Sequence, residues 1–445
     1  MISKNTNAKQ NKKIKSIQQK LDAIPCKKHA KESCFQIRKV QKIDGKTLLQ
    51  AFFFMAFKGS NSFLLWAVNV NNITGKRVSK QAVWKRITPC FTKFLQAILT
   101  DAFKQQVGYV HGKITKGIVK LNDYNRILIQ DSTVIALPDW LNWCFPGSTS
   151  NGQRKAQLKI QVIFDLISNT FVYFEITPYT ANDQSKAEEI TAIAKDGDLV
   201  IRDLGYFTLE SFKKMNQKDI KYVSRLKNNV KIYDITTGKE INLIAVLRKE
   251  GEFDDWVILG SKDKVAVRLV VQKLSEEQAN LRRFKAKKDR DKRLNHSKDY
   301  YELLCYSLYI TTVDQKDMSA TEVTKVYGLR WRIENIFKCW KSQFHIQKLI
   351  PKGCSLTKER VEAIIYMMLI FILLLQVTIY NYMIKQNKNK DDCIISVAKL
   401  CNYIANNIDL FFENSLKKLF PNIQYYCSYD NRKDRLNYVQ KFING

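Results

Sequence analysis

The spacing of apolar and polar residues changes twice along the chain. From about residue 47 to 118, apolar residues recur every three to four positions, as in LLQAFFFMAF, FLLWAVNV and CFTKFLQAILTDAF. This period predicts helices. From residue 125 the period falls to two, and after residue 350 it is helical again. The pattern therefore predicts a mixed α/β chain in which helical regions flank a centre that contains strands.

The first helical region contains a candidate for DNA recognition. Residues 63–87 predict two helices joined by a short turn at Gly75, with Ser79 as the cap of the second helix. The second helix carries the basic residues Lys80, Lys85 and Arg86. Both a helix-turn-helix element and a generic helical hairpin agree with this pattern. In either case we expect residues 25–118 to form a helical DNA-binding domain.

Strands are predicted after residue 125. NRILIQDSTVIAL, LKIQVIFDLI and TFVYFEIT follow one another with turn signals between them. A helix is predicted at 183–195, a strand at 198–203, a helix at 207–215 and a strand at 220–226. Three strands, a helix, a strand, a helix and a strand are the opening of an RNase-H-like α/β fold, so we assign residues 119–226 to the first part of such a core.

The next segment interrupts this order. Short alternating stretches over residues 227–299 predict a β-rich insertion. It ends in RRFKAKKDRDKRLNHSK, residues 282–298, which hold nine Lys or Arg and two Asp. The core is expected to resume over residues 300–348, followed by a helical C-terminal region at 349–445. Residues 1–24 read as a basic tail, and the core is expected to fold without residues 1–118.

One apolar run needs a separate interpretation. AIIYMMLIFILLLQVTIYNYMI, residues 363–384, carries no charge and is long enough to cross a bilayer. Gln376 and Asn381 interrupt it, and the rest of the chain has the composition of a soluble protein. A helix that is hydrophobic all round is also what the core of a large protein uses. We therefore expect a buried central helix, with a membrane span as the alternative.

The charge of the chain points to a polyanionic partner. Lys and Arg number 74 against 42 acidic residues, a formal net charge of +32. Such an excess is typical of proteins that bind nucleic acid. A basic surface in a lysine-rich proteome is the alternative.

Other classes of chemistry lack their motifs. The ten Cys form no C-x-x-C pair, which argues against zinc ribbons and redox motifs and favours reduced thiols in a cytosol. No G-x-x-x-x-G-K-[ST] occurs, so ATP is not expected as a cofactor. The first 20 residues are rich in Lys, Asn and Gln without an apolar run, so no signal peptide is expected. A cytoplasmic, nucleoid-associated protein follows as the expectation.

Three carboxylates fall on elements that converge in an RNase-H-like sheet. Asp131 lies on the first strand, Asp203 ends the strand LVIR, and Glu334 lies on a later helix. A charge within or at the end of an apolar strand is costly unless a metal or a base partners it. Carboxylate oxygens suit Mg²⁺ or Mn²⁺. The sequence therefore predicts a site for two such ions, which can activate a hydroxyl for attack on a phosphodiester.

Glu334 lies within a basic stripe. The segment VYGLRWRIENIFKCWKSQFH, residues 326–345, predicts one helix with an apolar face and an opposite polar face. The residues on the polar face are Tyr327, Arg330, Glu334, Lys338 and Lys341. A solvated face with one stray acid is the alternative to a functional stripe.

Four of these residues carry a resemblance to a known family. Tyr327, Arg330, Glu334 and Lys341 match the signature Y-x2-R-x3-E-x6-K. QDST around Asp131, IRDLGYF around Asp203 and SRLK at 224–227 also look like pieces of that family. Over roughly residues 45–385 the chain resembles the DDE transposases of bacterial insertion sequences, in the insertion-sequence-four family.

The resemblance implies a reaction and its partners. It implies an RNase-H-like core with a β-strand insertion, and cut-and-paste transposition by metal-dependent DNA strand cleavage and 3′-hydroxyl strand transfer. The partners are double-stranded DNA, as transposon ends and as target, and a second copy in a homodimer. A hairpin at the excised end is known for some members. Neither a membrane nor ATP is implied.

The resemblance also implies roles for single residues. Asp131, Asp203 and Glu334 become the catalytic metal ligands. Arg330 takes a phosphate bidentately, Lys341 supplies a point charge, and Tyr327 donates its hydroxyl or stacks on a displaced base. Lys338 belongs to the same stripe.

Other residues are weaker candidates for DNA contacts. Lys227 in SRLK is a candidate phosphate contact. Trp256 in the insertion can either stack on an unpaired base or pack in a core. A catalytically silent or domesticated DNA-binding relative, or a nuclease on the same fold, remains the alternative for the whole chain.

Overall fold

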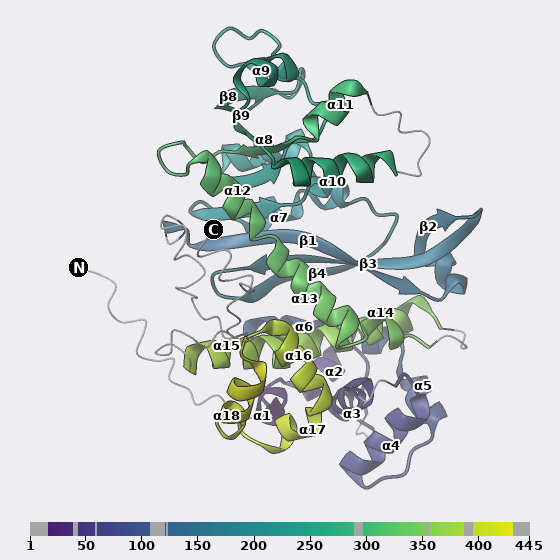
Figure 1. Ribbon diagram of the computed structural model, residues 1–445. Coiled ribbons are helices and arrows are strands. Elements are labelled where there is room, and N and C mark those ends of the chain that lie inside the picture. Colours follow the sequence, from purple (N-terminus) through teal and green to yellow (C-terminus); the bar gives the residue numbers. More distant parts are fainter. Residues whose placement is uncertain are drawn as a thin grey trace.

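The architecture is a central sheet with a helical bundle at one end and an insertion at the other (Figure 1). The computed structural model describes residues 17–38, 43–57, 60–106, 121, 123–288, 297–351, 356–386 and 395–429. Most of the predicted tail at residues 1–24 lies outside the described residues, and its last part forms helix α1 (Ile17–Asp22). The expected fold class, a mixed α/β fold with helical flanks, is confirmed.

Five strands form the part of the sheet that the sequence predicts. They are β1 (Arg126–Leu137), β3 (Gln153–Asp165), β4 (Thr170–Pro178), β5 (Asp198–Arg202) and β6 (Lys221–Arg225). β3 pairs antiparallel with both β1 and β4, whereas β5 runs parallel to β1 and β6 runs parallel to β5. The spatial order β4–β3–β1–β5–β6 is that of an RNase-H-like core. A short strand, β2 (Pro146–Ser150), extends the hairpin beside β3.

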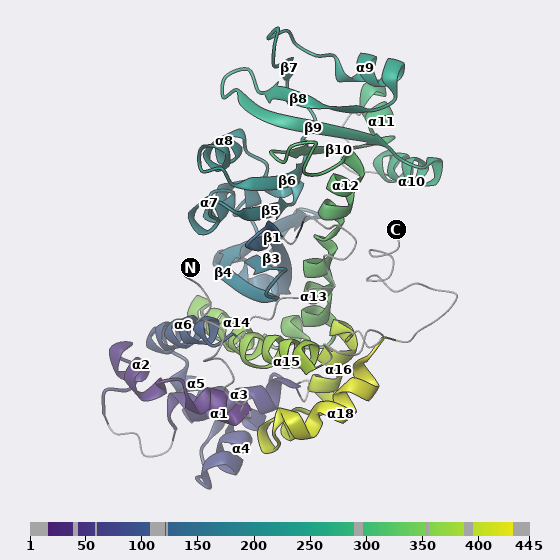
Figure 2. The same cartoon turned by 90° about the vertical axis from the view of Figure 1, so that its left-hand side faces the viewer.

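Helices cover both faces of this sheet, which explains the fully buried strand β5 and the long buried stretches of β1 and β3. α7 (Glu189–Ile193) and α8 (Leu209–Gln217) lie on one face, and α12 (Ala320–Gly328) and α13 (Trp331–Ser342) lie on the other (Figure 2). The helix predicted at 183–195 is shorter than expected, because a 3₁₀ turn (Asp183–Lys186) precedes α7.

The helix predicted over residues 326–345 is in fact two helices. α12 ends at Gly328 and α13 begins at Trp331. At the junction the Leu329 amide donates to the Val326 carbonyl at 3.0 Å, and the Arg330 amide donates to the Tyr327 carbonyl at 3.1 Å. These bonds span three residues, as in a 3₁₀ turn, which winds more tightly than an α-helix. Residues before the junction therefore do not keep the wheel position that a continuous helix gives them.

The insertion continues the central sheet instead of forming a separate module. Its strands are β7 (Ile232–Asp234), β8 (Phe253–Leu259) and β9 (Val265–Lys273), and its helices are α9 (Leu243–Glu250), α10 (Glu276–Lys287) and α11 (Lys298–Leu303). β10 (Tyr306–Thr311) pairs antiparallel with β6 on one side and with β9 on the other. Part of the predicted basic run, residues 289–296, lies outside the described residues. The insertion is thus tied rigidly to the core.

The helices from the two ends of the chain share one hydrophobic core. The N-terminal ones are α1, α2 (Cys26–Glu32), α3 (Gly45–Phe57), α4 (Phe63–Thr74), α5 (Lys80–Arg86) and α6 (Pro89–Lys104). The C-terminal ones are α14 (Lys358–Phe371), α15 (Thr378–Gln386), α16 (Val397–Asn406), α17 (Ile408–Glu413) and α18 (Leu416–Cys427). α6 lies beside α14 (Figure 2). The expectation that the core folds without residues 1–118 therefore does not agree with the packing.

The apolar run at 363–384 lies in the centre of this bundle. In the described part of the chain, one helix, residues 358–386, is long and apolar enough to cross a membrane, but 94% of its most apolar window is buried inside the fold. A π-helical segment, Ile372–Val377, joins α14 to α15. There the Gln376 side chain accepts a hydrogen bond from the buried indole of Trp340 at 3.1 Å. The helix packs as the core of the bundle.

Candidate active site

The three acids predicted from the sequence come together around one arginine, beside the carboxyl end of β5. Asp131 lies in the middle of β1, Asp203 directly follows β5, and Glu334 lies in the first turn of α13. In the parallel pair β1–β5, Gln130 is aligned with Arg202, so the next residue of each strand reaches the same level. α13 runs along one face of the sheet (Figure 2). Its residue Glu334 shares the guanidinium of Arg330 with the two aspartates.

The guanidinium of Arg330 lies between all three carboxylates. Its Nη1 atom is 2.9 Å from Asp131 Oδ2, its Nη2 atom is 2.7 Å from Glu334 Oε1, and its Nε atom is 3.7 Å from Asp203 Oδ1. The side chain is only 14% exposed. The predicted convergence of the acids is thus observed, while their catalytic role stays a prediction. Arg330, expected to face DNA, faces the acids in this structure.

Burial and charge set the protonation of this cluster. Burial raises the pKa of Asp131 to about 7, the Arg330 charge opposes this rise, and the charges of Asp203 and Glu334 add to it. Burial acts to lower the pKa of Arg330, but its interactions with Tyr327 and the three acids outweigh burial and raise it. The guanidinium therefore stays charged and compensates the carboxylates around it.

The donor set suits a hard divalent cation, because carboxylates offer only oxygen ligands. In the described part of the chain, no three His, Cys, Asp or Glu side chains lie close enough to hold one metal ion. The Arg330 guanidinium lies where the three carboxylates would have to meet. The three carboxylates thus have the chemistry that such an ion requires, and the guanidinium occupies the space between them in this structure.

A fourth acid, Asp183, supports the site from the opposite face of the sheet, and the sequence interpretation missed it. Asp183 Oδ1 accepts hydrogen bonds from Lys159 Nζ at 3.0 Å, from Gln161 Nε2 at 3.0 Å and from Ser132 Oγ at 3.3 Å. Ser132 is the neighbour of Asp131, so the network fixes the strand that carries the acid. Lys159 and Gln161 alternate within the apolar stretch LKIQVIF. A lysine in a buried strand was the signal that an acid would face it.

Tyr327 belongs to the site through its ring. Its side chain is buried, with its ring centroid 5.1 Å from that of Tyr309. The guanidinium carbons of Arg225 and Arg330 lie 5.6 and 5.7 Å from the same ring. These neighbours cover the ring, which argues for positioning of the two arginines over stacking on a displaced base.

Arg225 is a further residue that the sequence interpretation passed over. It is the last residue of β6 and pairs with Tyr309 of β10. It lies two residues beyond Val223, which pairs with Ile201 of β5, so it reaches the same level of the sheet as Asp203. No ion pair of Arg225 with an acid occurs among the described residues. Arg225 lies in the segment SRLK, two residues before the predicted phosphate contact Lys227, and this position could have identified it as a candidate.

The two lysines of the stripe differ in their surroundings. Lys338 is exposed, and its ammonium lies 5.6 Å from the Trp331 ring centroid. Lys341 is partly buried, which lowers its pKa. Both follow Glu334 along α13, so they extend the positive charge away from the acids along this helix.

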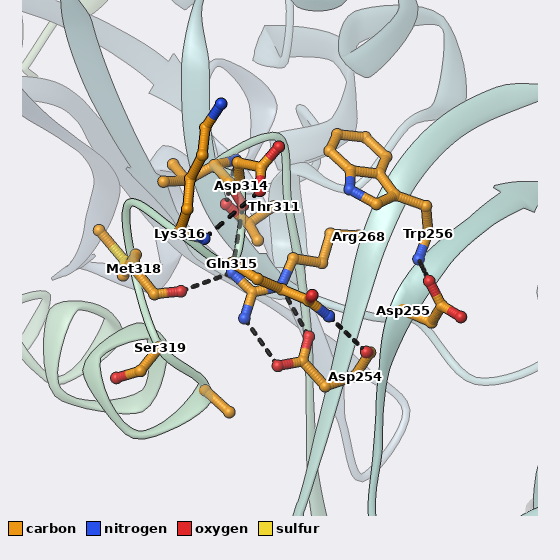
Figure 3. Close-up of polar contacts among 12 residues, drawn as sticks. Asp254, Asp255, Trp256, Arg268, Thr311, Asp314, Gln315, Lys316, Met318 and Ser319 are labelled. Carbon is orange, nitrogen blue, oxygen red and sulfur yellow. Dashed lines mark hydrogen bonds and ion pairs between the residues drawn. The ribbon is translucent and has the colours of Figure 1, made fainter.

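Trp256 lies far from the acids. It is on β8, and β6, β10 and β9 separate β8 from β5, a spacing of about 19 Å at the usual strand separation. Arg268 of β9, fully buried, forms a bidentate pair with Asp254 and donates to the Val313 and Met318 carbonyls (Figure 3). This clamp fixes the insertion to the loop that leads into α12.

The remaining predicted contacts lie in other places. Lys227 is exposed just after β6. Lys80, Lys85 and Arg86 lie on α5 in the helical bundle, away from the acids. Gly75 ends α4 with a φ of 69°, and the Ser79 side chain caps α5 by accepting from the Ala82 amide at 3.1 Å. The turn and the cap are as predicted, and the geometry agrees with both a helix-turn-helix and a helical hairpin.

Comparisons with known proteins show that the chain is similar to transposases. The profile of a family described as "Transposase DDE domain" matches residues 125–374, from β1 into the apolar helix. The transposase for insertion sequence element IS231F of Bacillus thuringiensis subsp. israelensis is 28% identical, over 93% of this chain and 90% of its own. The transposase for insertion sequence element IS1151 of Clostridium perfringens is 27% identical, over 83% and 82%. A cryo-EM structure of a piggyBac transposase synaptic complex with hairpin DNA aligns with 94% of this chain and 81% of its own, at 9% identity and a TM-score of 0.45.

Proposed function

The chain belongs to the family of transposases with a DDE domain, and from this premise we propose that it moves an insertion sequence by cut-and-paste transposition. The reaction is metal-dependent cleavage of DNA strands followed by transfer of the 3′-hydroxyl end to target DNA. One observation supports this proposal above all others. Three carboxylates from two strands and a helix surround one guanidinium beside the carboxyl end of β5 in an RNase-H-like sheet.

Asp131, Asp203 and Glu334 are the proposed ligands of Mg²⁺ or Mn²⁺, and DDE transposases generally use divalent metal ions. Ions held by these three residues would supply the chemistry that activates a hydroxyl nucleophile and stabilises the leaving oxygen of the phosphodiester. The protein fixes the positions of the ligands. β1 and β5 hold the two aspartates in register, the Asp183 network holds β1, and α13 carries Glu334.

The basic residues around the acids are the proposed contacts to DNA. Arg225 reaches the level of Asp203 in the sheet, and Lys338 and Lys341 follow Glu334 along α13, whereas Lys227 is exposed just after β6. Basic side chains attract phosphates, and the chain has a net charge of +32. Tyr327 orients Arg225 and Arg330 through its ring. Its hydroxyl remains a proposed phosphate donor.

The helical bundle is the proposed site of end recognition. α5 presents Lys80 and Lys85 to solvent, with Arg86 partly buried. The guanidinium of Arg360 on α14 lies 3.9 Å from the centre of its Trp84 ring, so the basic helix packs against the apolar helix at the centre of the bundle. Action as a homodimer on two DNA ends follows from the family resemblance and is part of the proposal. Trp256 is a weaker candidate for a contact with unpaired DNA, because of its distance from the acids.

A strand-transfer assay with the full-length chain tests this function. The substrate is a duplex that ends in the inverted repeat flanking the gene, supplied uncut or pre-cut with a free 3′-hydroxyl. In Mg²⁺ we expect the uncut end to be cleaved and the pre-cut end to be joined to plasmid DNA. A pre-cut end with a 3′-dideoxy terminus is the matched control, because it binds but cannot join.

The two alternative functions give different results in the same assay. A nuclease on this fold cuts the uncut end but joins neither substrate. A catalytically silent relative binds the end and neither cuts nor joins it. Either result would contradict the proposed transposition.

A further inference from the structure

Arg330 is the only cation that the structure places among the three acids, within the described residues. It donates a hydrogen bond to Asp131 at 2.9 Å and forms a close ion pair with Glu334 at 2.7 Å. Its Nε atom is buried and has no hydrogen-bond partner in the part of the chain that the structure describes. The third acid, Asp203, is 3.7 Å from this atom. The guanidinium thus forms close ion pairs with Asp131 and Glu334 and a longer one with Asp203.

A metal ion at this site would need the place that the guanidinium holds. The nearest oxygens of the three carboxylates lie 2.7–3.7 Å from three different nitrogens of Arg330, so the guanidinium fills the space between them. A divalent cation placed a few ångströms from a guanidinium would be repelled strongly in a site of low dielectric. The arginine and the metal therefore exclude each other from the same cluster of acids.

We propose that Arg330 is a stand-in cation that assembles the acid cluster before metal binds, and that it must leave the cluster when metal enters. This inference rests on the proposed function, because it concerns the same metal site. With no cation present, three carboxylates at this spacing would repel one another. One guanidinium holds the two strands and the helix in register until the metal replaces it.

The position of Arg330 gives it a route out. It lies at the junction between α12 and α13, where the 3₁₀ hydrogen bonds replace the α-helical ladder. The Tyr327 ring already lies 5.7 Å from the guanidinium carbon, so it can keep contact with the charge as the guanidinium leaves the acids. Outside the acid cluster the guanidinium becomes available to a DNA phosphate, which is the contact that the family resemblance implies. Metal loading would thus release the group that grips DNA.

Loss of the Arg330 guanidinium should raise the affinity of the chain for a divalent metal ion. Arg330→Gln should bind Mn²⁺ more tightly than the parent chain in the absence of DNA, by about tenfold or more, because no cation competes for the acids. Lys213→Gln on α8 is the matched control, since it removes the same charge from an exposed residue outside the proposed site. Its Mn²⁺ affinity should stay close to that of the parent. Arg330→Lys keeps the positive charge but loses the planar guanidinium that contacts several carboxylates at once. Its affinity for Mn²⁺ should therefore lie between those of Arg330→Gln and the parent chain.

The experiment is a Mn²⁺ titration of the full-length chain without DNA, followed by electron paramagnetic resonance of free Mn²⁺. Circular dichroism checks that each variant is folded, and thermal unfolding gives a second readout. Without metal, Arg330→Gln should unfold at a lower temperature than the parent chain. Added Mn²⁺ should raise its unfolding temperature more than that of the parent. Equal or weaker Mn²⁺ binding by folded Arg330→Gln and Arg330→Lys would overturn the stand-in role and leave the proposed function intact. If the parent chain and Asp131→Asn bind Mn²⁺ equally, the metal site itself is wrong, and the inference falls with it.

Discussion

Asp203→Asn is expected to slow strand cleavage on the order of a thousandfold or more while leaving binding to DNA ends close to that of the parent chain. Asparagine keeps the shape of aspartate but removes the charge that a divalent cation needs. The side chain is 38% exposed, so the substitution should not disturb packing. Asp131→Asn and Glu334→Gln should behave in the same way. Cleavage of end-labelled DNA in Mg²⁺ and a mobility-shift assay measure the two effects separately.

The control for these variants is an acid away from the site. Glu210 on α8 is exposed and pairs with Lys214 at 3.0 Å. Glu210→Gln should cut at the rate of the parent chain. If one of the three site variants also cuts at that rate, the residue concerned is not a metal ligand.

A chain that begins at residue 119 is expected to be insoluble or unfolded. The N-terminal helices cover the apolar helix at 358–386: the Phe53 ring packs 5.2 Å from that of Phe371, and Thr92 donates to the Glu359 carbonyl at 3.1 Å. Each large apolar side chain buried there contributes about 1.5–3 kcal/mol. The loss of a handful exceeds the roughly 5–15 kcal/mol that stabilise a typical domain. Soluble yield and a thermal melt by circular dichroism measure the outcome.

Single substitutions separate this packing effect from loss of chain length. Phe53→Ala, at a fully buried position, should cost about 3–5 kcal/mol. Leu64→Ala on α4, where the side chain is 61% exposed, should cost less than about 0.5 kcal/mol. A chain of residues 119–445 with a cooperative melt would show that the core does not depend on the N-terminal helices.

The period of the sequence was enough to find the strands and the acids. The core strands contain apolar stretches such as ILI in β1 and LVI in β5, so a charged residue within or after such a stretch stands out in the sequence. Asp131 and Asp203 were found in this way, because a buried carboxylate needs a partner. Glu334 needed the spacing of the residues around it as well.

The parts that the sequence did not reveal depend on contacts between distant segments. The junction between α12 and α13 depends on hydrogen bonds that the apolar pattern does not encode. At this junction Arg330 donates a hydrogen bond to Asp131, 199 positions earlier in the chain. The packing of the N-terminal helices against the C-terminal helices could not be predicted either. The apolar face of an amphipathic helix shows that something covers it but not which segment does. The continuation of the sheet through β10 and β9 also depends on pairing between distant segments.

The proposal that Asp131, Asp203 and Glu334 bind one metal centre is tested most directly by cutting the protein at its own metal site. Fe²⁺ replaces Mg²⁺ in the purified chain, and ascorbate with hydrogen peroxide then generates hydroxyl radicals that cleave the backbone near the bound ion. We expect cuts around residues 131, 203 and 334, which are far apart in the sequence. Excess Mg²⁺ should suppress them, and Asp131→Asn should lack them. Cuts at unrelated positions, or cuts that persist unchanged in Asp131→Asn, would contradict the assignment of this site.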